Sequence, residues 1–295
     1  MSKVKVNDVE LEYDTFGDPS SRPLLLIMGL GAQMIAWDEK FCQKLVEQDF
    51  FVIRFDNRDV GLSTKFEEAG LPNLKEAFKK REAGELIPSP YKIEDMADDA
   101  VGLLSALNID KAHICGASMG GMIAQIIAYK HPSRVLSLTS IMSSTGNPDL
   151  PQAKPEAMNV LFKPLPDERE AYIKASLENR RIIHGTGLPF DEEKACRLVA
   201  ASYDRSYYRP GFIRQLVAIW ASGNRKDALK TITAPTLVIH GEGDPLVPVE
   251  GGKDTAEAIP GAELLLIDGM GHSLPIQVWS IIFDAISKNA AKASQ

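Results

Sequence analysis

Short apolar runs alternate along the chain with longer stretches in which apolar residues recur every three or four positions. The runs, each of strand length, cover residues 23–27, 51–55, 112–115, 135–142, 236–240 and 264–267. Helical spacing of apolar residues marks residues 37–48 and 91–107, which predicts amphipathic helices there. Strands that alternate with helices on this scale predict a parallel sheet with both faces covered. We therefore expect an α/β fold.

Both ends of the chain depart from this alternation. Near the start, residues 4–6 and 9–13 flank Asn7-Asp8, a hairpin signal that predicts two antiparallel strands. At the other end, residues 287–295 are small and polar, and we expect this tail to fray.

The strand pattern also stops in the middle of the chain, from about residue 143 to residue 224. Prolines begin this stretch, and segments compatible with helices follow at residues 168–179 and 192–201. The strand pattern then returns at Thr236. We expect an α/β core made of residues 1–142 and 225–295, interrupted by a helical cap of residues 143–224.

A candidate nucleophile lies between the run at residues 112–115 and a helix-like stretch that ends near Tyr129. The connecting sequence is Gly116-Ala117-Ser118-Met119-Gly120. A G-x-S-x-G motif between a strand and a helix is typical of a nucleophile elbow, a tight turn that exposes a serine hydroxyl above the end of a sheet. Glycines on either side let the strand and the helix approach closely, because they carry no Cβ. Ser118 is therefore the candidate nucleophile.

An acid and a base follow Ser118, each just past an apolar run: Asp244 comes first and His272 second. This is the chain order of an α/β-hydrolase triad, and open α/β sheets build their sites at the carboxyl ends of strands. His272 would take the serine proton, and Asp244 would hold the imidazole in one tautomer. Asp268 is the alternative acid, but it precedes His272 on the same turn and is poorly placed to reach the far ring nitrogen.

Two backbone N–H groups are candidates for stabilising an oxyanion. In an α/β hydrolase one donor follows the nucleophile and the other comes from the loop after the third strand. Met119 follows Ser118, and the glycine-bearing loop Met28-Gly29-Leu30-Gly31-Ala32 follows the run at residues 23–27. We assign the N–H groups of Met119 and Leu30 to this role.

These motifs resemble those of the α/β-hydrolase superfamily over most of the chain. Within it, the sequence is most similar to the family of aclacinomycin methylesterase and related serine carboxylesterases. The similarity includes the Met28-Gly29 opening of the loop, the turn at residues 55–63, Ser-Met-Gly at the elbow and the segment at residues 185–190. Leu30 departs from the glycine of that family, although a main-chain donor needs no particular side chain. The resemblance implies a mostly parallel sheet of about eight strands covered by helices, with a cap that selects the substrate.

Composition bears on whether the protein binds a nucleic acid, a metal or a cofactor. The 295-residue chain has 44% hydrophobic and 25% charged residues and a net charge of −7, which is ordinary for a globular protein and argues against nucleic acid, whose phosphates attract a basic face. No cluster of side chains offers a ligand set for a metal, and we expect no cofactor. His240 is near Asp244 in sequence; a structural role is the simpler interpretation, and support of the acid is the alternative.

The cysteines and the lengths of the apolar runs indicate in which cellular compartment the protein works. Cys42, Cys115 and Cys196 are odd in number and scattered, so neither a disulfide framework nor a zinc site is indicated. No run approaches the length of a membrane span, and the first residues lack the apolar region of a signal peptide. We expect a cytoplasmic protein. The pattern predicts no particular oligomeric state.

The sequence therefore predicts a serine carboxylic ester hydrolase acting on short to medium or methyl esters of small molecules through an acyl-enzyme. A cofactor-free perhydrolase or haloperoxidase, or a hydrolase of C–C bonds, would use the same scaffold and remains an alternative. A receptor that kept the fold and lost catalysis is a further alternative, which the intact set of Ser118, Asp244 and His272 disfavours.

Overall fold

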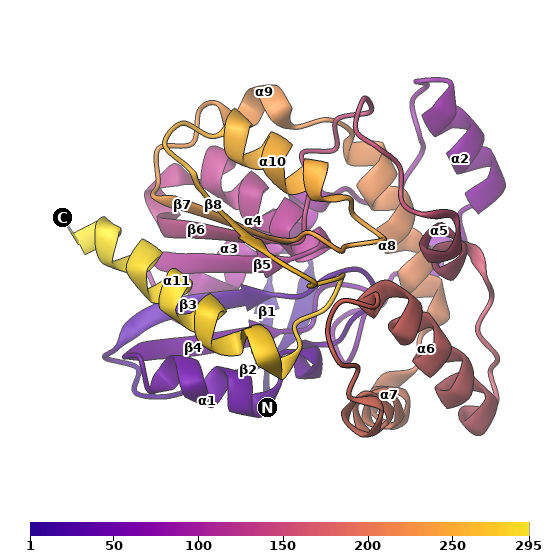
Figure 1. Ribbon diagram of the computed structural model, residues 1–295, viewed down its shortest axis with the longest axis horizontal. Helices are drawn as coiled ribbons and strands as arrows, with labels where there is room; N and C mark the ends of the chain where they lie inside the picture. The colour runs from indigo at the N-terminus through magenta and orange to yellow at the C-terminus, as the bar shows by residue number, and fades with distance from the viewer. Residues whose placement is uncertain (295) are drawn as a thin grey trace.

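The computed structural model describes residues 1–294 as an eight-stranded sheet covered by helices on both faces (Figure 1). The strands are β1 (Ser2–Val6), β2 (Val9–Phe16), β3 (Arg22–Ile27), β4 (Phe50–Phe55), β5 (Ala112–Ala117), β6 (Val135–Ile141), β7 (Thr236–Gly241) and β8 (Glu263–Ile267), in the spatial order β1-β2-β4-β3-β5-β6-β7-β8. Both pairings of β2 are antiparallel and the others are parallel. The predicted hairpin, parallel sheet and fold class are confirmed.

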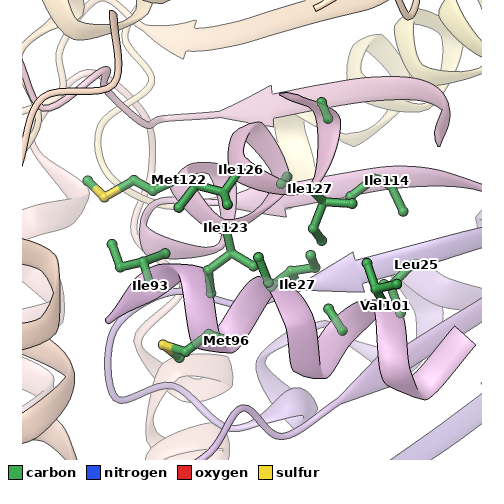
Figure 2. Packing of buried hydrophobic residues seen from close by; sticks show 14 of the residues in the cluster. Leu25, Ile27, Ile93, Met96, Val101, Ile114, Met122, Ile123, Ile126 and Ile127 are labelled. Atoms are coloured by element: carbon green, nitrogen blue, oxygen red, sulfur yellow. The ribbon is translucent and has the colours of Figure 1, made fainter. Parts of the chain in front are cut away.

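One face of the sheet is covered by α3 (Ile93–Ala106), α4 (Met119–Lys130) and α10 (Val249–Ala258), and the other by α1 (Glu39–Val46) and α11 (Trp279–Ala291). Figure 2 shows how α3 and α4 bury aliphatic side chains against one another and against β3 and β5. Ile123 at the centre of this layer is fully buried; burying such a side chain contributes about 1.5–3 kcal/mol.

The central strands bring distant loops together at one edge of the sheet. β3 and β5 are parallel neighbours, and Ile27 pairs with Gly116. Their side chains are buried on both faces, which is why they are apolar almost throughout. The register places the loop after β3 beside the turn after β5, so the two predicted oxyanion loops meet there.

Five helices lie between β6 and β7: α5 (Pro155–Phe162), α6 (Arg169–His184), α7 (Glu192–Ser206), α8 (Arg209–Ser222) and the short α9 (Lys226–Leu229). The first four, with α2 (Leu74–Glu82), gather at the end of the sheet where β5 runs into α4 (Figure 1). The helical pattern expected for this stretch is present, and its role as a cap is taken up below.

The expectation for the tail is wrong. Helix α11 continues through Ala291 and a short 3-10 turn follows it. Asn289 is buried and its side-chain amide donates to the Leu138 carbonyl at 2.9 Å, while Ile286 and Ala290 pack into the core. The hydrogen bond of Asn289 and the burial of Ala290 therefore hold the first part of the predicted tail against the core. Gln295, the last residue of the predicted tail, lies outside the described residues.

No helix within residues 1–294 is long and apolar enough to cross a membrane.

Candidate active site

Ser118 lies on a strained turn between β5 and α4. Its φ and ψ are 58° and −121°, a region that costs a residue other than glycine about 1–3 kcal/mol. The backbone on both sides of the serine is held: its N–H donates to the Ile141 carbonyl at 2.9 Å, and Ser143 Oγ donates to its carbonyl at 2.8 Å. The strain therefore persists because hydrogen bonds to β6 and the segment after it fix the turn. The side chain is half-buried between buried neighbours.

The glycines of the elbow are required by close contacts of the backbone. A Cβ at Gly116 would lie 2.0 Å from the Gly120 carbonyl oxygen, and a Cβ at Gly120 would lie 2.1 Å from the Ile27 carbonyl oxygen. Neither neighbour is a side chain that could move aside. The G-x-S-x-G spacing is thus a consequence of α4 crossing tightly over β5 and β3.

The structure brings Ser118, His272 and Asp244 together. His272 Nε2 lies 2.9 Å from Ser118 Oγ, and His272 Nδ1 lies 2.7 Å from Asp244 Oδ2. An ionised carboxylate only accepts hydrogen bonds, so Nδ1 carries the proton and the neutral ring leaves Nε2 to accept from the serine hydroxyl. This is the geometry that a general base requires when it faces a nucleophile and an acid holds its ring.

Asp244 is oriented by its own loop. Its Oδ1 accepts from the N–H groups of Leu246 and Val247, each at 2.9 Å, which leaves Oδ2 for His272. The alternative acid, Asp268, is exposed, and no hydrogen bond joins it to another described residue. The geometry therefore favours Asp244 as the partner of the ring.

His240 holds the loop that carries Asp244. It is fully buried, and its Nε2 donates to the Val247 carbonyl at 2.8 Å while lying 3.6 Å from Asp244 Oδ2. Burial lowers the pKa of His240, and the nearby Asp244 only partly offsets this. The ring is therefore a neutral donor that fixes the loop carrying Asp244. His240 thus combines the structural role and the support of the acid that the sequence analysis gave as alternatives.

The loop at residues 28–32 lies beside the elbow, as the strand register requires. A Cβ at Gly29 would lie 3.0 Å from Ser118 Cβ and 3.4 Å from Ser118 Oγ. Met119 is the first residue of α4, where backbone N–H groups have no partner within the helix. Within residues 1–294, neither Met119 N–H nor Leu30 N–H donates to the protein. Both candidate donors are thus available next to the serine, and their role in binding an oxyanion stays a prediction.

Sequence reasoning missed the contacts that hold the loop at residues 268–273, here called the His272 loop. Its backbone packs on the end of α6: His272 N–H donates to the Ile183 carbonyl at 2.8 Å, and Ser273 Oγ lies 2.8 Å from His184 Nδ1. A Cβ at Gly187 would lie 2.4 Å from both Cα and O of Gly269. Gly187 belongs to the segment on which the resemblance rested, but its partner could not be identified from spacing.

Within residues 1–294, no group of three or more His, Cys, Asp or Glu side chains is arranged to hold a metal ion. Two hollows, of about 250 and 730 Å³, lie away from the triad. The smaller lies between α5 and α6, and the larger lies beside β1 and α3. Neither is lined by Ser118, Asp244 or His272.

A family model for the alpha/beta hydrolase fold matches residues 22–277. The chain therefore belongs to the α/β-hydrolase fold family, as the motifs predicted. It is similar to the rhodomycin D methylesterases DauP of Streptomyces sp. and DnrP of Streptomyces peucetius, at 29% and 28% identity over 309 aligned residues, covering 98% of this chain and 97% of each relative. Among solved structures, a meta-cleavage product hydrolase from Pseudomonas fluorescens IP01 matches 99% of this chain and 98% of its own, with a TM-score of 0.75 at 19% identity.

Proposed function

We propose that this protein is a serine carboxylic ester hydrolase that works through an acyl-enzyme. The observation that carries the proposal is the His272 ring, which lies 2.9 Å from Ser118 Oγ on one side and 2.7 Å from Asp244 Oδ2 on the other. A serine hydroxyl is a weak nucleophile at neutral pH, and a positioned base removes this limit. Membership in the family and similarity to two methylesterases support ester hydrolysis.

In the first half-reaction, Ser118 Oγ attacks the ester carbonyl carbon as its proton passes to His272 Nε2. The carbonyl oxygen becomes an oxyanion, which accepts hydrogen bonds from the N–H groups of Leu30 and Met119; each such donor contributes about 3 kcal/mol in the transition state. The imidazolium is stabilised by Asp244 and returns the proton to the ester oxygen. The C–O bond breaks, the alcohol leaves and the acyl group stays on Ser118.

In the second half-reaction, water replaces the alcohol. His272 Nε2 takes a proton from the water as its oxygen attacks the acyl carbonyl, and the oxyanion is stabilised by the same two N–H groups. Collapse of this intermediate breaks the bond to Ser118 Oγ, which recovers its proton from His272. The products are a carboxylic acid and the free enzyme.

The substrate we propose is a small-molecule ester with a short to medium acyl chain or a methyl group on the alcohol side. Similarity to rhodomycin D methylesterases supports methyl esters. The surface of α6 supports a dissolved substrate, because it carries exposed charges, including Arg169 paired with Asp204 and Arg181 paired with Glu192. An enzyme that binds oil droplets would need a broad apolar face there.

Residues 143–224 form the cap that selects this substrate. Two contacts with the candidate site support this part of the proposal. Phe212 of α8 packs against Gly31 of the 28–32 loop, and the Ile183 carbonyl at the end of α6 accepts from His272 N–H. These contacts bring α6 and α8 next to the candidate site, which supports a role for their side chains in deciding which acyl and alcohol groups fit.

A series of p-nitrophenyl esters from acetate to palmitate, with Ser118→Ala as the blank, tests the proposal. We expect turnover that is highest for short chains and absent in the variant. Methyl esters of bulky acids and cleavable diketones form the second panel. Release of a C–C cleavage product without any ester turnover would replace the proposal with C–C bond hydrolysis, and full ester turnover by Ser118→Ala would overturn it.

A further inference from the structure

The 28–32 loop is anchored on both sides of the peptide that carries the Leu30 N–H. On one side, Asn57 Nδ2 donates to the Met28 carbonyl at 3.0 Å. On the other side, Gly31 N–H donates to Gln215 Oε1 at 2.8 Å. The Gly29–Leu30 peptide lies between these two anchored peptides. Its own carbonyl accepts from Ala32 N–H at 3.2 Å, which is at the long end of the normal range. Because this turn contains two glycines, and Gly31 has a φ of +66°, the local backbone holds the peptide only weakly.

Gln215 comes from α8, far away in sequence, and its amide is held in one orientation. The side chain is fully buried, and Nε2 donates to the Arg58 carbonyl at 2.7 Å. A carbonyl cannot donate, so the amide nitrogen must face Arg58 and the amide oxygen must face Gly31. Both ends of the amide are thus used, one on the turn after β4 and one on the 28–32 loop.

Two neighbours of Gln215 make this anchor rigid. Phe212, on the preceding turn of α8, packs on Gly31, where a Cβ would lie 2.6 Å from its ring. Arg214 is buried and forms two hydrogen bonds to Asp59, at 2.8 and 2.9 Å. The helix that presents Gln215 is therefore fixed to the core by an ion pair beside it, and the amide position is set by α8 as a whole.

We propose that Gln215 is a positioning residue that holds the 28–32 loop so that the Leu30 N–H points to the oxyanion. This inference rests on the proposed ester hydrolysis. Without the amide, the Gly31 N–H loses its acceptor, and only the 3.2 Å bond from Ala32 N–H to the Gly29 carbonyl still holds this turn. The Leu30–Gly31 peptide can then rotate, which tilts the peptide before it. The serine, the base and the acid stay in place, so the loss falls on transition-state stabilisation and not on substrate binding.

The test uses the full-length variants Gln215→Leu and Gln215→Glu. Leucine removes both hydrogen bonds, while glutamate keeps an acceptor for Gly31 N–H and loses the donor to the Arg58 carbonyl. Removing an oxyanion donor outright lowers kcat by about 10²–10³-fold. Since Met119 N–H remains, we expect Gln215→Leu to lower kcat by about 10–100-fold with KM within about twofold, and Gln215→Glu to lower it less.

The matched control is Val217→Ala, which creates a cavity on the same helix at a fully buried residue that packs with Ala77 and Ile87. A second readout is the affinity for a trifluoromethyl ketone, whose adduct with a serine places an oxyanion in the same position. We expect this affinity to fall in parallel with kcat in the Gln215 variants and to stay near the wild-type value in Val217→Ala. If Gln215 has only a structural role, its variants should have a lower melting temperature, but their kcat and ketone affinity should not fall together.

Two results would overturn the inference: folded Gln215 variants with kcat within twofold of wild type, or an equal loss of kcat and ketone affinity in Val217→Ala. If Gln215→Leu does not fold, the Gln215→Glu variant decides by the same criteria. Failure of the proposed function is a different result, because wild-type protein would then show no ester turnover before any variant is made.

Discussion

The buried ion pair between Arg214 of α8 and Asp59 after β4 leads to a sharp prediction about stability. Both side chains are about 99% buried. Arg214 also donates to the Gly70 carbonyl and the Tyr208 hydroxyl, and Tyr91 donates to Asp59 at 2.7 Å. The hydrogen bonds to Asp59 raise the pKa of Arg214, while burial, together with the Asp59 charge, raises the pKa of Tyr91. Arg214 is therefore held in its protonated form against the Asp59 carboxyl group.

The perturbation is Asp59→Asn. Asp59 has a φ of 69°, a left-handed conformation that asparagine tolerates nearly as well as aspartate, so the change removes the charge without adding backbone strain. It leaves a buried guanidinium without a counter-charge. Breaking a buried pair in this way costs about 3–5 kcal/mol, and at 2–4 °C for each kcal/mol the melting temperature should fall by roughly 6–20 °C.

The assay is thermal and urea unfolding followed by circular dichroism, with the double variant Asp59→Asn/Arg214→Met as the control. Removing the unpaired Arg214 guanidinium as well should recover part of the lost stability, because a buried ion pair and a hydrophobic replacement often give a similar free energy of unfolding. A melting temperature for Asp59→Asn within about 2 °C of wild type would refute the reasoning. So would a double variant whose loss equals the sum of the two single losses.

Three further predictions follow from single contacts. Gly187→Ala should lower kcat about tenfold or more, because its Cβ would displace Gly269 and with it the His272 loop. Asp244→Asn should lower kcat by about 10⁴-fold at neutral pH, because the ring loses the acceptor that fixes its tautomer. Burial lowers the pKa of His113 to about 4, so between about pH 6.5 and pH 4 the unfolded chain binds a proton that the native state does not. The free energy of unfolding should therefore fall by about 3 kcal/mol as the pH is lowered through this range. His113→Gln should remove this contribution to the pH dependence.

Each of these has a control and a contradicting result. Thr186→Ala, at the exposed neighbour of Gly187, should keep kcat, and a Gly187→Ala enzyme with the wild-type kcat would show that the loops are not coupled. Wild-type turnover by Asp244→Asn would remove Asp244 from the triad. Ser137→Ala removes the hydrogen-bond partner of His113 without removing a titrating group, so its pH slope should match wild type; an equal slope in His113→Gln would contradict the assignment.

The elbow was predictable from sequence because its geometry is local. Strand, turn and helix are contiguous there. The close contacts that require Gly116 and Gly120 arise wherever a helix crosses this closely over the strand before it. The order of Ser118, Asp244 and His272 was informative for a related reason: parallel strands end at the same edge of the sheet, so side chains that follow strands gather without any knowledge of the loops.

The anchors of the site were not predictable in this way. Gln215 and Gly31 are 184 residues apart, and Arg214 and Asp59 are 155 apart. In the sequence Gln215 is one polar residue beside apolar ones, and its burial depends on how α8 docks on the core. The error at the tail has the same origin, because Asn289 looks like a surface residue until its hydrogen bond to β6 is seen.

The most direct test of the account is to find where the acyl group is during turnover. A rapid quench of wild-type protein mixed with p-nitrophenyl acetate, followed by peptide mapping by mass spectrometry, measures this. We expect a burst of nitrophenol and an acetyl group on the peptide that contains Ser118, both absent in Ser118→Ala. Ester turnover with the acetyl group on another residue, or without any covalent intermediate, would contradict it.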